Sequence, residues 1–241
     1  MPDAFYFTRA RLRRDVPAAA LRAILAPPGE SARTAAAHRL VWTLFGDRPD
    51  RARDFLWREA DAGVFYLLSM REPHDAHGLF ELDPPKPFAP VLAAGDRLAF
   101  MLRANATVSR GTGSDRRGKP CDVVMDALYR IPQTERARAR QEAIATAGTA
   151  WLGAQGAKAG FALAGVDSSP GQHGGAPCGA VTVTAYRTLR LDRPGAPARL
   201  GVLDFEGLLE VREPSRFVAA VAHGFGRAKA FGCGLMLIRR A

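Results

Sequence analysis

The order of apolar and polar residues divides the chain into segments of strand and helix. Apolar and aromatic residues that alternate with polar ones predict a first strand over residues 4–12. Apolar residues at helical spacing predict a helix over 31–45, which the Gly/Pro segment 46–49 ends. A short helical segment is predicted over 50–57, and the apolar run 64–70 predicts a buried strand.

The second half of the chain repeats this mixture after a proline-rich stretch. Four prolines between residues 82 and 90 indicate a linker or an edge crossing between the two halves. The alternation of Leu98, Phe100 and Leu102 then predicts a strand over 97–104. The later elements follow from the same two patterns: a helix within 131–152, a short strand over 161–166, a long hairpin with arms 181–191 and 199–211 and its turn near 192–195, a helix over 214–223, and a final buried strand over 235–238.

Strands mixed with a few helices in each half predict an α+β fold made of two layered sandwiches. The proline-rich stretch separates them. We expect an N-terminal domain over residues 1–83, a linker over 84–94 and a C-terminal domain over 95–241.

The charge of the chain favours a polyanionic partner. The net charge is +10 and the isoelectric point is about 10.3, which fits a protein that binds nucleic acid. Because the chain is rich in Ala, Arg, Gly and Pro, its basicity can also reflect genome composition. The positions of the cations are therefore more informative than their total.

Cysteine usage and hydropathy exclude other classes of protein. The chain has 3 cysteines, and their wide spacing favours neither a disulfide framework nor a zinc site. We expect no metal and no cofactor. The N-terminus lacks a basic segment followed by a long apolar stretch, and no later segment is long enough to span a bilayer. We expect a cytoplasmic protein that does not contact a membrane.

The most informative segment is glycine-rich and lies near the C-terminus. It contains four glycines and two cations, followed directly by the apolar run. Consecutive free N–H groups beside cations suit a phosphate, although tight turns use glycine for structural reasons alone. The predicted phosphate cradle consists of Gly224, Gly226, Gly232 and Gly234 with Arg227 and Lys229.

Two further groups of cations are candidates for contact with a nucleic acid. The predicted hairpin carries Arg187, Arg190, Arg193 and Arg199. Arginines on a β-ribbon can contact phosphates and guanine edges. The second group is the polar loop that contains Arg110, Arg116, Arg117 and Lys119, with Arg103 and Asn105 at its base. A solvated surface is the alternative for both groups.

His38 is the candidate acid/base residue. Histidine suits proton transfer because its unperturbed pKa lies near neutrality. At helical spacing His38 lies at the edge of the apolar stripe, on the same side as Trp42. Such a boundary residue can reach a ligand, or it can be purely structural. The other histidines (His74, His77, His173 and His223) lie in polar or terminal segments and are weaker candidates.

Several blocks of sequence together resemble the CRISPR repeat-processing endoribonucleases, and most closely the CasE subunit of type I-E Cascade. They occur in the order of that family and span most of the chain. The blocks are His38–Phe45, Asp47–Pro49 with Arg53–Trp57, Pro84–Phe88 with Gly95–Leu98 and Leu102–Asn105, Leu203–Val211, and the glycine-rich segment from Gly224 to Gly234.

The resemblance implies two tandem ferredoxin-like (RRM-like) domains, each an antiparallel sheet with helices on one face. It implies a metal-independent endoribonuclease that binds the hairpin of the CRISPR repeat and cuts precursor crRNA by attack of the 2′-OH. The product would carry a cyclic 2′,3′-phosphate and stay bound, with other Cascade subunits as partners in antiviral defence. His38 would be the general acid/base, and the hairpin arginines would contact the RNA stem-loop.

The chain departs from the family pattern at one position. Related enzymes commonly place a tyrosine one helical turn before the histidine, where this chain has Ala35. Tyr6 or a cation could substitute, and the proton-transfer partner of His38 is left open. Two other hypotheses remain: an RNA-hairpin-binding assembly subunit with little or no catalysis, and an unrelated α+β protein whose basicity reflects composition.

Overall fold

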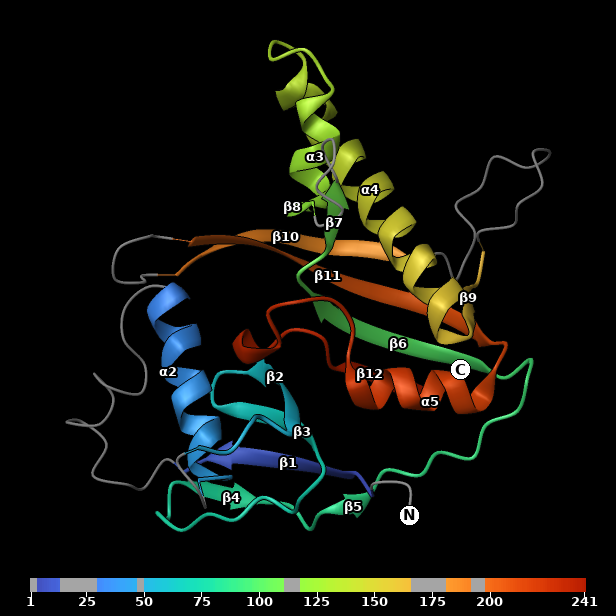
Figure 1. Cartoon of the computed structure of the whole chain (residues 1–241). Coiled ribbons are helices and arrows are strands. Elements are labelled where there is room, and N and C mark those ends of the chain that lie inside the picture. The colour runs from blue at the N-terminus through green and yellow to red at the C-terminus, as the bar shows by residue number, and fades with distance from the viewer. Residues whose placement is uncertain (1–3, 14–29, 47–49, 111–117, 166–180, 192–197) are drawn as a thin grey trace.

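The computed structural model describes residues 4–13, 30–46, 50–110, 118–165, 181–191 and 198–241, which form two large antiparallel sheets (Figure 1). The first sheet has the strand order β2-β3-β1-β4. Its strands are β1 (Tyr6–Leu12), β2 (Phe55–Asp61), β3 (Val64–Ser69) and β4 (Phe80–Leu82), and β5 (Lys86–Pro87) also pairs with β1.

The second sheet repeats the strand order of the first. It runs β10-β11-β6-β12, so in both sheets the first and third strands lie at the centre and the second and fourth at the edges. This is the order of a ferredoxin-like β-α-β-β-α-β unit. The strands are β6 (Arg97–Ala104), β10 (Thr182–Leu191), β11 (Ala198–Val211) and β12 (Met236–Arg240), and β9 (Phe161–Leu163) also pairs with β11.

The helices complete the two units (Figure 1). α2 (Glu30–Thr43) buries Leu40 and Val41 against the first sheet, and α4 (Arg136–Ala159) buries Trp151 and Leu152 against the second. α5 (Pro214–His223) belongs to the second core, and the 3-10 turn η1 (Lys229–Phe231) follows it. A small projection consists of β7 (Thr107–Arg110), β8 (Lys119–Asp122) and α3 (Val123–Tyr129). The predicted α+β fold is confirmed.

The two units share a packed boundary. Leu56 and Leu68, on strands of the first sheet, belong to the core cluster of the second unit. Phe55, Trp57 and Phe65 lie on the opposite side, in the core under α2. The first sheet is therefore covered on both faces.

The predicted helix over residues 50–57 is wrong, because Phe55–Asp61 is the edge strand β2. Phe55 to Arg58 are all buried, so the segment shows no alternation. A strand buried on both faces has an apolar run that periodicity cannot distinguish from a short helix.

Most of the other elements match their sequence predictions within a few residues. The strand pair β7–β8 and the helix α3 were not predicted, and α4 extends beyond the predicted 131–152 to Ala159. The predicted hairpin turn at 192–195 lies outside the described residues. Among the helices that the structure describes, none is long and apolar enough to cross a membrane.

Candidate functional site

The site begins with His38 on α2, which is partly buried. The indole N–H of Trp42, one turn later, donates a hydrogen bond of 2.8 Å to Nε2 of His38. The imidazole ring also lies 6.1 Å from the ring of Phe231, centre to centre. Because Phe231 belongs to η1, the catalytic candidate on the first unit meets the glycine-rich segment of the second. The packing of α2 thus brings the two predicted motifs together.

The glycine-rich segment turns sharply and fits tightly between the two units. Gly224, Gly226, Gly232 and Gly234 all have positive φ. A Cβ on Gly232 would lie 3.1 Å from the ring of Trp57, and one on Gly226 would lie 2.8 Å from a backbone oxygen. These two glycines therefore allow the chain to pass close to its own core. The segment is held rigidly beside α2.

The charge of Arg53 acts on two other groups at this junction, His38 and Lys229. Burial, then Arg53 and Arg39, lower the pKa of His38. Burial, then Arg53, lower the pKa of Lys229. Arg53 therefore lies within electrostatic range of both His38 and Lys229, and its own pKa is lowered by burial. Arg53 and Lys229 form a cluster of positive charge beside His38, between η1, α2 and the start of β2.

Arg53 lacks a compensating partner among the described residues. Its Nη1 atom is buried and makes no hydrogen bond. The adjacent carboxylate of Asp54 is used elsewhere, because Arg71 donates to it through Nε at 2.6 Å and through Nη2 at 3.1 Å. A buried nitrogen of a guanidinium that has no acceptor is unfavourable. An anion bound beside Arg53 and Lys229 would supply that acceptor.

A second cluster of cations surrounds Asp204 on β11. Arg103 donates to this carboxylate through Nε at 2.8 Å and through Nη2 at 3.2 Å. Arg187 forms an ion pair with the same carboxylate, and Nη2 of Arg58 lies 4.0 Å from it. Two of the predicted RNA-binding residues, Arg103 and Arg187, therefore share one internal partner. They tie β6, β10 and β11 together.

Asn105 and Arg227 support the glycine-rich segment through the backbone. The side-chain amide of Asn105 is buried and donates to the carbonyl of Gly201 at 2.7 Å. The carbonyl of Asn105 accepts from the N–H of Arg227 at 3.3 Å. Asn105 therefore fixes this loop from inside, while the Arg227 side chain is exposed at its surface.

The long hairpin presents cations at its outer end. Arg190 on β10 and Arg199 on β11 are directly opposite each other, and both are exposed. The hairpin therefore places two cations close together at this end. α2, the helix that carries His38, contacts β10, and Figure 1 shows the hairpin of β10 and β11 reaching over one end of α2. Arg193, Arg116 and Arg117 lie outside the described residues.

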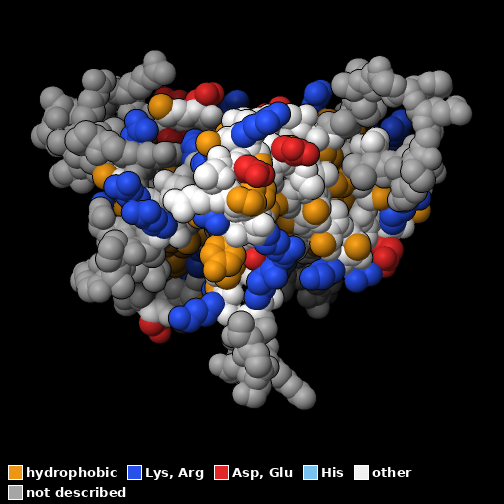
Figure 2. Space-filling model, turned by 90° about the horizontal axis from the view of Figure 1, so that it is seen from above, with side chains coloured by type: hydrophobic (Ala, Val, Ile, Leu, Met, Phe, Trp, Pro, Cys, Tyr) orange, Lys and Arg blue, Asp and Glu red, His pale blue; other side chains and the backbone are white. Residues whose placement is uncertain are grey.

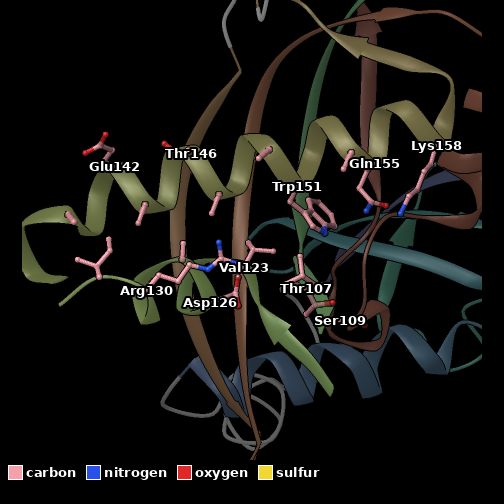
Figure 3. A pocket seen from close by; sticks show the side chains of 18 residues that line it. Thr107, Ser109, Val123, Asp126, Arg130, Glu142, Thr146, Trp151, Gln155 and Lys158 are labelled. Atoms are coloured by element: carbon pink, nitrogen blue, oxygen red, sulfur yellow. Dashed lines mark hydrogen bonds and ion pairs between the residues drawn. The ribbon is translucent and has the colours of Figure 1, made fainter. Parts of the chain in front are cut away.

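Other surface features lie apart from this junction. Figure 2 shows Lys and Arg side chains spread over the face seen from above, with fewer Asp and Glu side chains. A groove of about 940 Å³ lies between α3 and α4 (Figure 3). Its walls include Asp126, Arg130, Trp151 and Lys158. None of the predicted site residues lines this groove.

Sequence reasoning missed Arg53 and the hydrogen bond from Trp42 to His38. Arg53 precedes β2 in a segment for which the sequence predicts a helix. It belongs to the block Arg53–Trp57, one of the blocks that resemble the family. The signal in the sequence is that Arg53 lies two residues before a segment of large apolar residues, Phe55–Trp57. Only the packing of η1 against α2 and β2 shows that Arg53 approaches both His38 and Lys229.

Comparison with known proteins shows which family this chain is similar to. A model of the family described as CRISPR associated protein matches residues 5–240. The CRISPR-associated endoribonuclease Cse3 of Thermus thermophilus is 27% identical over 195 residues, which cover 76% of this chain and 78% of that protein. The CRISPR system Cascade subunit CasE of Escherichia coli is 27% identical over 205 residues, which cover 83% of this chain and 88% of that protein.

Solved structures share the fold over nearly the whole chain. Thermus thermophilus Cse3 bound to an RNA representing a pre-cleavage complex has a TM-score of 0.65 at 24% identity, covering 98% of this chain and 99% of that one. Cas6e from Escherichia coli has a TM-score of 0.57 at 20% identity, covering 98% and 100%. The family match spans both units and includes the helix of His38 and the glycine-rich segment. The chain therefore belongs to the CRISPR associated protein family, as a relative of the Cse3 and CasE proteins.

Proposed function

We propose that this chain is a metal-independent endoribonuclease that binds the hairpin of a CRISPR repeat transcript and cuts it with His38 as the acid/base residue. The observation that carries this proposal is the junction of His38 with two cations, Arg53 and Lys229, whose charges no described carboxylate balances. An imidazole beside unbalanced cations suits a reaction in which a phosphate gains negative charge. The relatives named endoribonucleases support the reaction class.

In the proposed reaction the 2′-oxygen of one nucleotide attacks the adjacent phosphorus. A bond forms between the 2′-oxygen and phosphorus, and the bond from phosphorus to the 5′-oxygen breaks. The products are a cyclic 2′,3′-phosphate and a 5′-hydroxyl. One proton leaves the 2′-hydroxyl and one is added to the departing 5′-oxygen, so the reaction needs a base and an acid but no metal.

His38 is the proposed base. Its lowered pKa keeps the imidazole neutral at neutral pH. Nε2 carries the lone pair, since it accepts the bond from Trp42. The hydrogen bond from the indole N–H must break before this lone pair can accept the proton of the 2′-hydroxyl. The bond to Trp42 therefore orients the ring until the substrate displaces it.

Lys229 is the proposed acid, in place of the tyrosine that Ala35 replaces. Burial and the charge of Arg53 lower the pKa of Lys229, which makes its ammonium a better proton donor. Arg53 keeps its charge at any physiological pH and cannot donate a proton readily. Arg53 would stabilise the charge on the non-bridging oxygens of the phosphate instead.

The proposed RNA-binding surface extends from this junction to the hairpin. Arg190, Arg199 and Arg227 are exposed cations near it and would contact the phosphates of the stem. A related chain has been solved within a CRISPR RNA-guided surveillance complex, with a TM-score of 0.56. We propose that this chain likewise keeps its crRNA and joins other Cascade subunits. Since its substrate is a transcript, we expect it in the cytoplasm.

The proposal is tested by single-turnover cleavage of the cognate repeat RNA in EDTA, with binding measured alongside. Wild type should cut the RNA in EDTA, and a 2′-deoxy substitution at the cut site should abolish cleavage. His38→Ala should lose cleavage and keep binding. Cutting of the deoxy substrate, or equal rates for wild type and His38→Ala, would refute the mechanism.

The alternative function is an assembly subunit that binds the hairpin without cutting it. Two observations favour it: Ala35 stands where relatives carry a tyrosine, and Trp42 occupies Nε2 of His38. Specific, tight binding of the repeat hairpin with intact RNA after long incubation would establish this function. Equal affinity for repeat and scrambled hairpins at moderate salt would exclude both functions.

A further inference from the structure

A cavity of about 350 Å³ opens beside the cation cluster, between the first sheet and α5. Arg53 and Lys229 line it, and both also approach His38. The rest of its lining comes from the ends of β2 and β3, from the start of the chain and from the last turn of α5. These residues include Phe5, Phe55, Leu56, Met70, Ala222 and His223.

The lining has two chemically distinct parts. Phe5, Leu56 and Met70 form an apolar part, which suits the face of an aromatic ring. Arg53 and Lys229 form a cationic part, in which the buried Nη1 of Arg53 has no hydrogen-bond partner. The carboxylate of Asp54 also lines the cavity, but Arg71 holds it. The cavity therefore lacks a free anion to balance the cations.

We propose that this cavity binds the nucleoside adjoining the scissile phosphate, with the base in the apolar part and the phosphate against Arg53 and Lys229. The inference rests on the proposed function, because it places the scissile phosphate at these two cations. It adds a subsite in which one unpaired base is removed from the RNA stack. That subsite would hold the reacting phosphate in register with His38.

Size and charge favour a nucleotide over a peptide segment. A volume of about 350 Å³ lies at the lower end of the range for small-molecule sites, roughly 300–1,000 Å³, and suits a single nucleoside. An apolar peptide side chain would fill the apolar part but leave the buried Nη1 of Arg53 without an acceptor. A nucleoside phosphate satisfies both parts together.

The test combines a filled cavity with an RNA that lacks one base. Ala222→Leu adds a side chain from the wall of the cavity without altering His38, Arg53 or Lys229. Ala219→Leu fills it from the same helix and serves as a second variant, since Ala219 also lines the cavity. Ser215→Leu is the matched control, because Ser215 is exposed on α5 outside the cavity. Repeat RNAs carry an abasic site at either nucleotide next to the cut.

Removal of the base that enters the cavity should slow single-turnover cleavage by wild type about 10-fold, the usual effect of losing one stacked base. An abasic site at the other neighbour should have little effect. Ala222→Leu and Ala219→Leu should cut the intact RNA about 10-fold more slowly than Ser215→Leu. Both variants should cut the RNA that lacks the cavity-bound base as fast as wild type cuts the same RNA.

Two results would overturn the inference. One is equal cleavage of intact and abasic RNAs by wild type. The other is that Ala222→Leu slows cleavage of the abasic RNA as much as it slows cleavage of the intact RNA. That result would indicate a general disturbance of the protein. The dissociation constants of the same RNAs measure the dependence on this base independently of the cleavage rate. If His38→Ala cuts normally but the base dependence is present, the proposed function fails and the subsite stands.

Discussion

The indole N–H of Trp42 donates to Nε2 of His38 at 2.8 Å, one helical turn along α2. A nitrogen that accepts this bond must offer its lone pair, so the imidazole is neutral with its proton on Nδ1. Burial and the charges of Arg53 and Arg39 lower the pKa of His38. They therefore favour the neutral imidazole, as the indole bond does. The free protein thus holds a neutral imidazole beside two cations.

Trp42→Phe should move the acid limb of the cleavage profile to higher pH. The indole bond favours the neutral imidazole, so its removal raises the pKa of His38. A base is active only when neutral, so activity is lost as the pH falls through that pKa. The wild-type limb therefore lies below the usual histidine value, and the limb of the variant lies above the wild-type one.

This change is measured by single-turnover cleavage against pH and by the NMR titration of the His38 ring. Phenylalanine keeps an aromatic ring against Phe55, which Trp42 meets at 5.1 Å between ring centres. The edge-to-face ring contact that supports α2 is therefore retained. A variant whose acid limb and ring titration both match those of wild type would show that the indole bond does not control His38.

Arg53→Gln should reduce single-turnover cleavage by roughly 10²–10³-fold, the usual effect of removing one donor that stabilises a developing oxyanion. It should also raise the pKa of His38, because Arg53 is the larger of the two charge effects that lower it. Arg39→Gln is the matched control, since Arg39 is exposed and acts less strongly on the same imidazole. Equal losses of rate in the two variants would argue against a specific role for Arg53.

Lys229→Arg and Lys229→Gln separate charge from proton donation. Arginine keeps the positive charge but does not release its proton readily. Both variants should therefore lower the cleavage rate by about 10²-fold or more, whereas only Lys229→Gln should weaken RNA binding. Cleavage by Lys229→Arg at the wild-type rate would show that Lys229 acts as a charge alone.

Gly232→Ala should destabilise the protein by roughly 2–4 kcal/mol, from the cost of positive φ and from overpacking. Gly232 has φ +72, and an added Cβ would lie 3.1 Å from the Trp57 ring. Gly78→Ala isolates the first cost, because Gly78 has φ +64 and nothing within 4 Å of the added atom. Denaturant titration measures both, and equal losses would mean that the contact with Trp57 costs nothing.

Replacing both Arg190 and Arg199 with Gln should weaken hairpin RNA binding and its dependence on salt. Each lost phosphate contact should reduce the slope of log K against log salt by about 0.7–1. An unchanged salt slope would place the RNA elsewhere.

Local pattern was enough for much of the fold and for part of the candidate site. Alternation predicted β1 and β6, and the long apolar arms predicted the hairpin of β10 and β11. The glycines that the sequence clusters near the C-terminus all have positive φ in the structure. These features depend on residues adjacent in sequence, whose steric and periodic preferences act locally.

The tertiary structure decided the rest, because it depends on contacts between distant residues. β2 was missed because α2 covers one of its faces and the second unit covers the other, which removes the alternation. Arg103 and Asn105 bond inward to Asp204 and Gly201, which their polarity alone could not indicate. The sequence by itself determined the α+β class, most of the strands and helices, the histidine on its helix and the glycine-rich turn. Only packing of the two units brought Arg53, Lys229 and His38 together, since burial and charge interact through space and not along the chain.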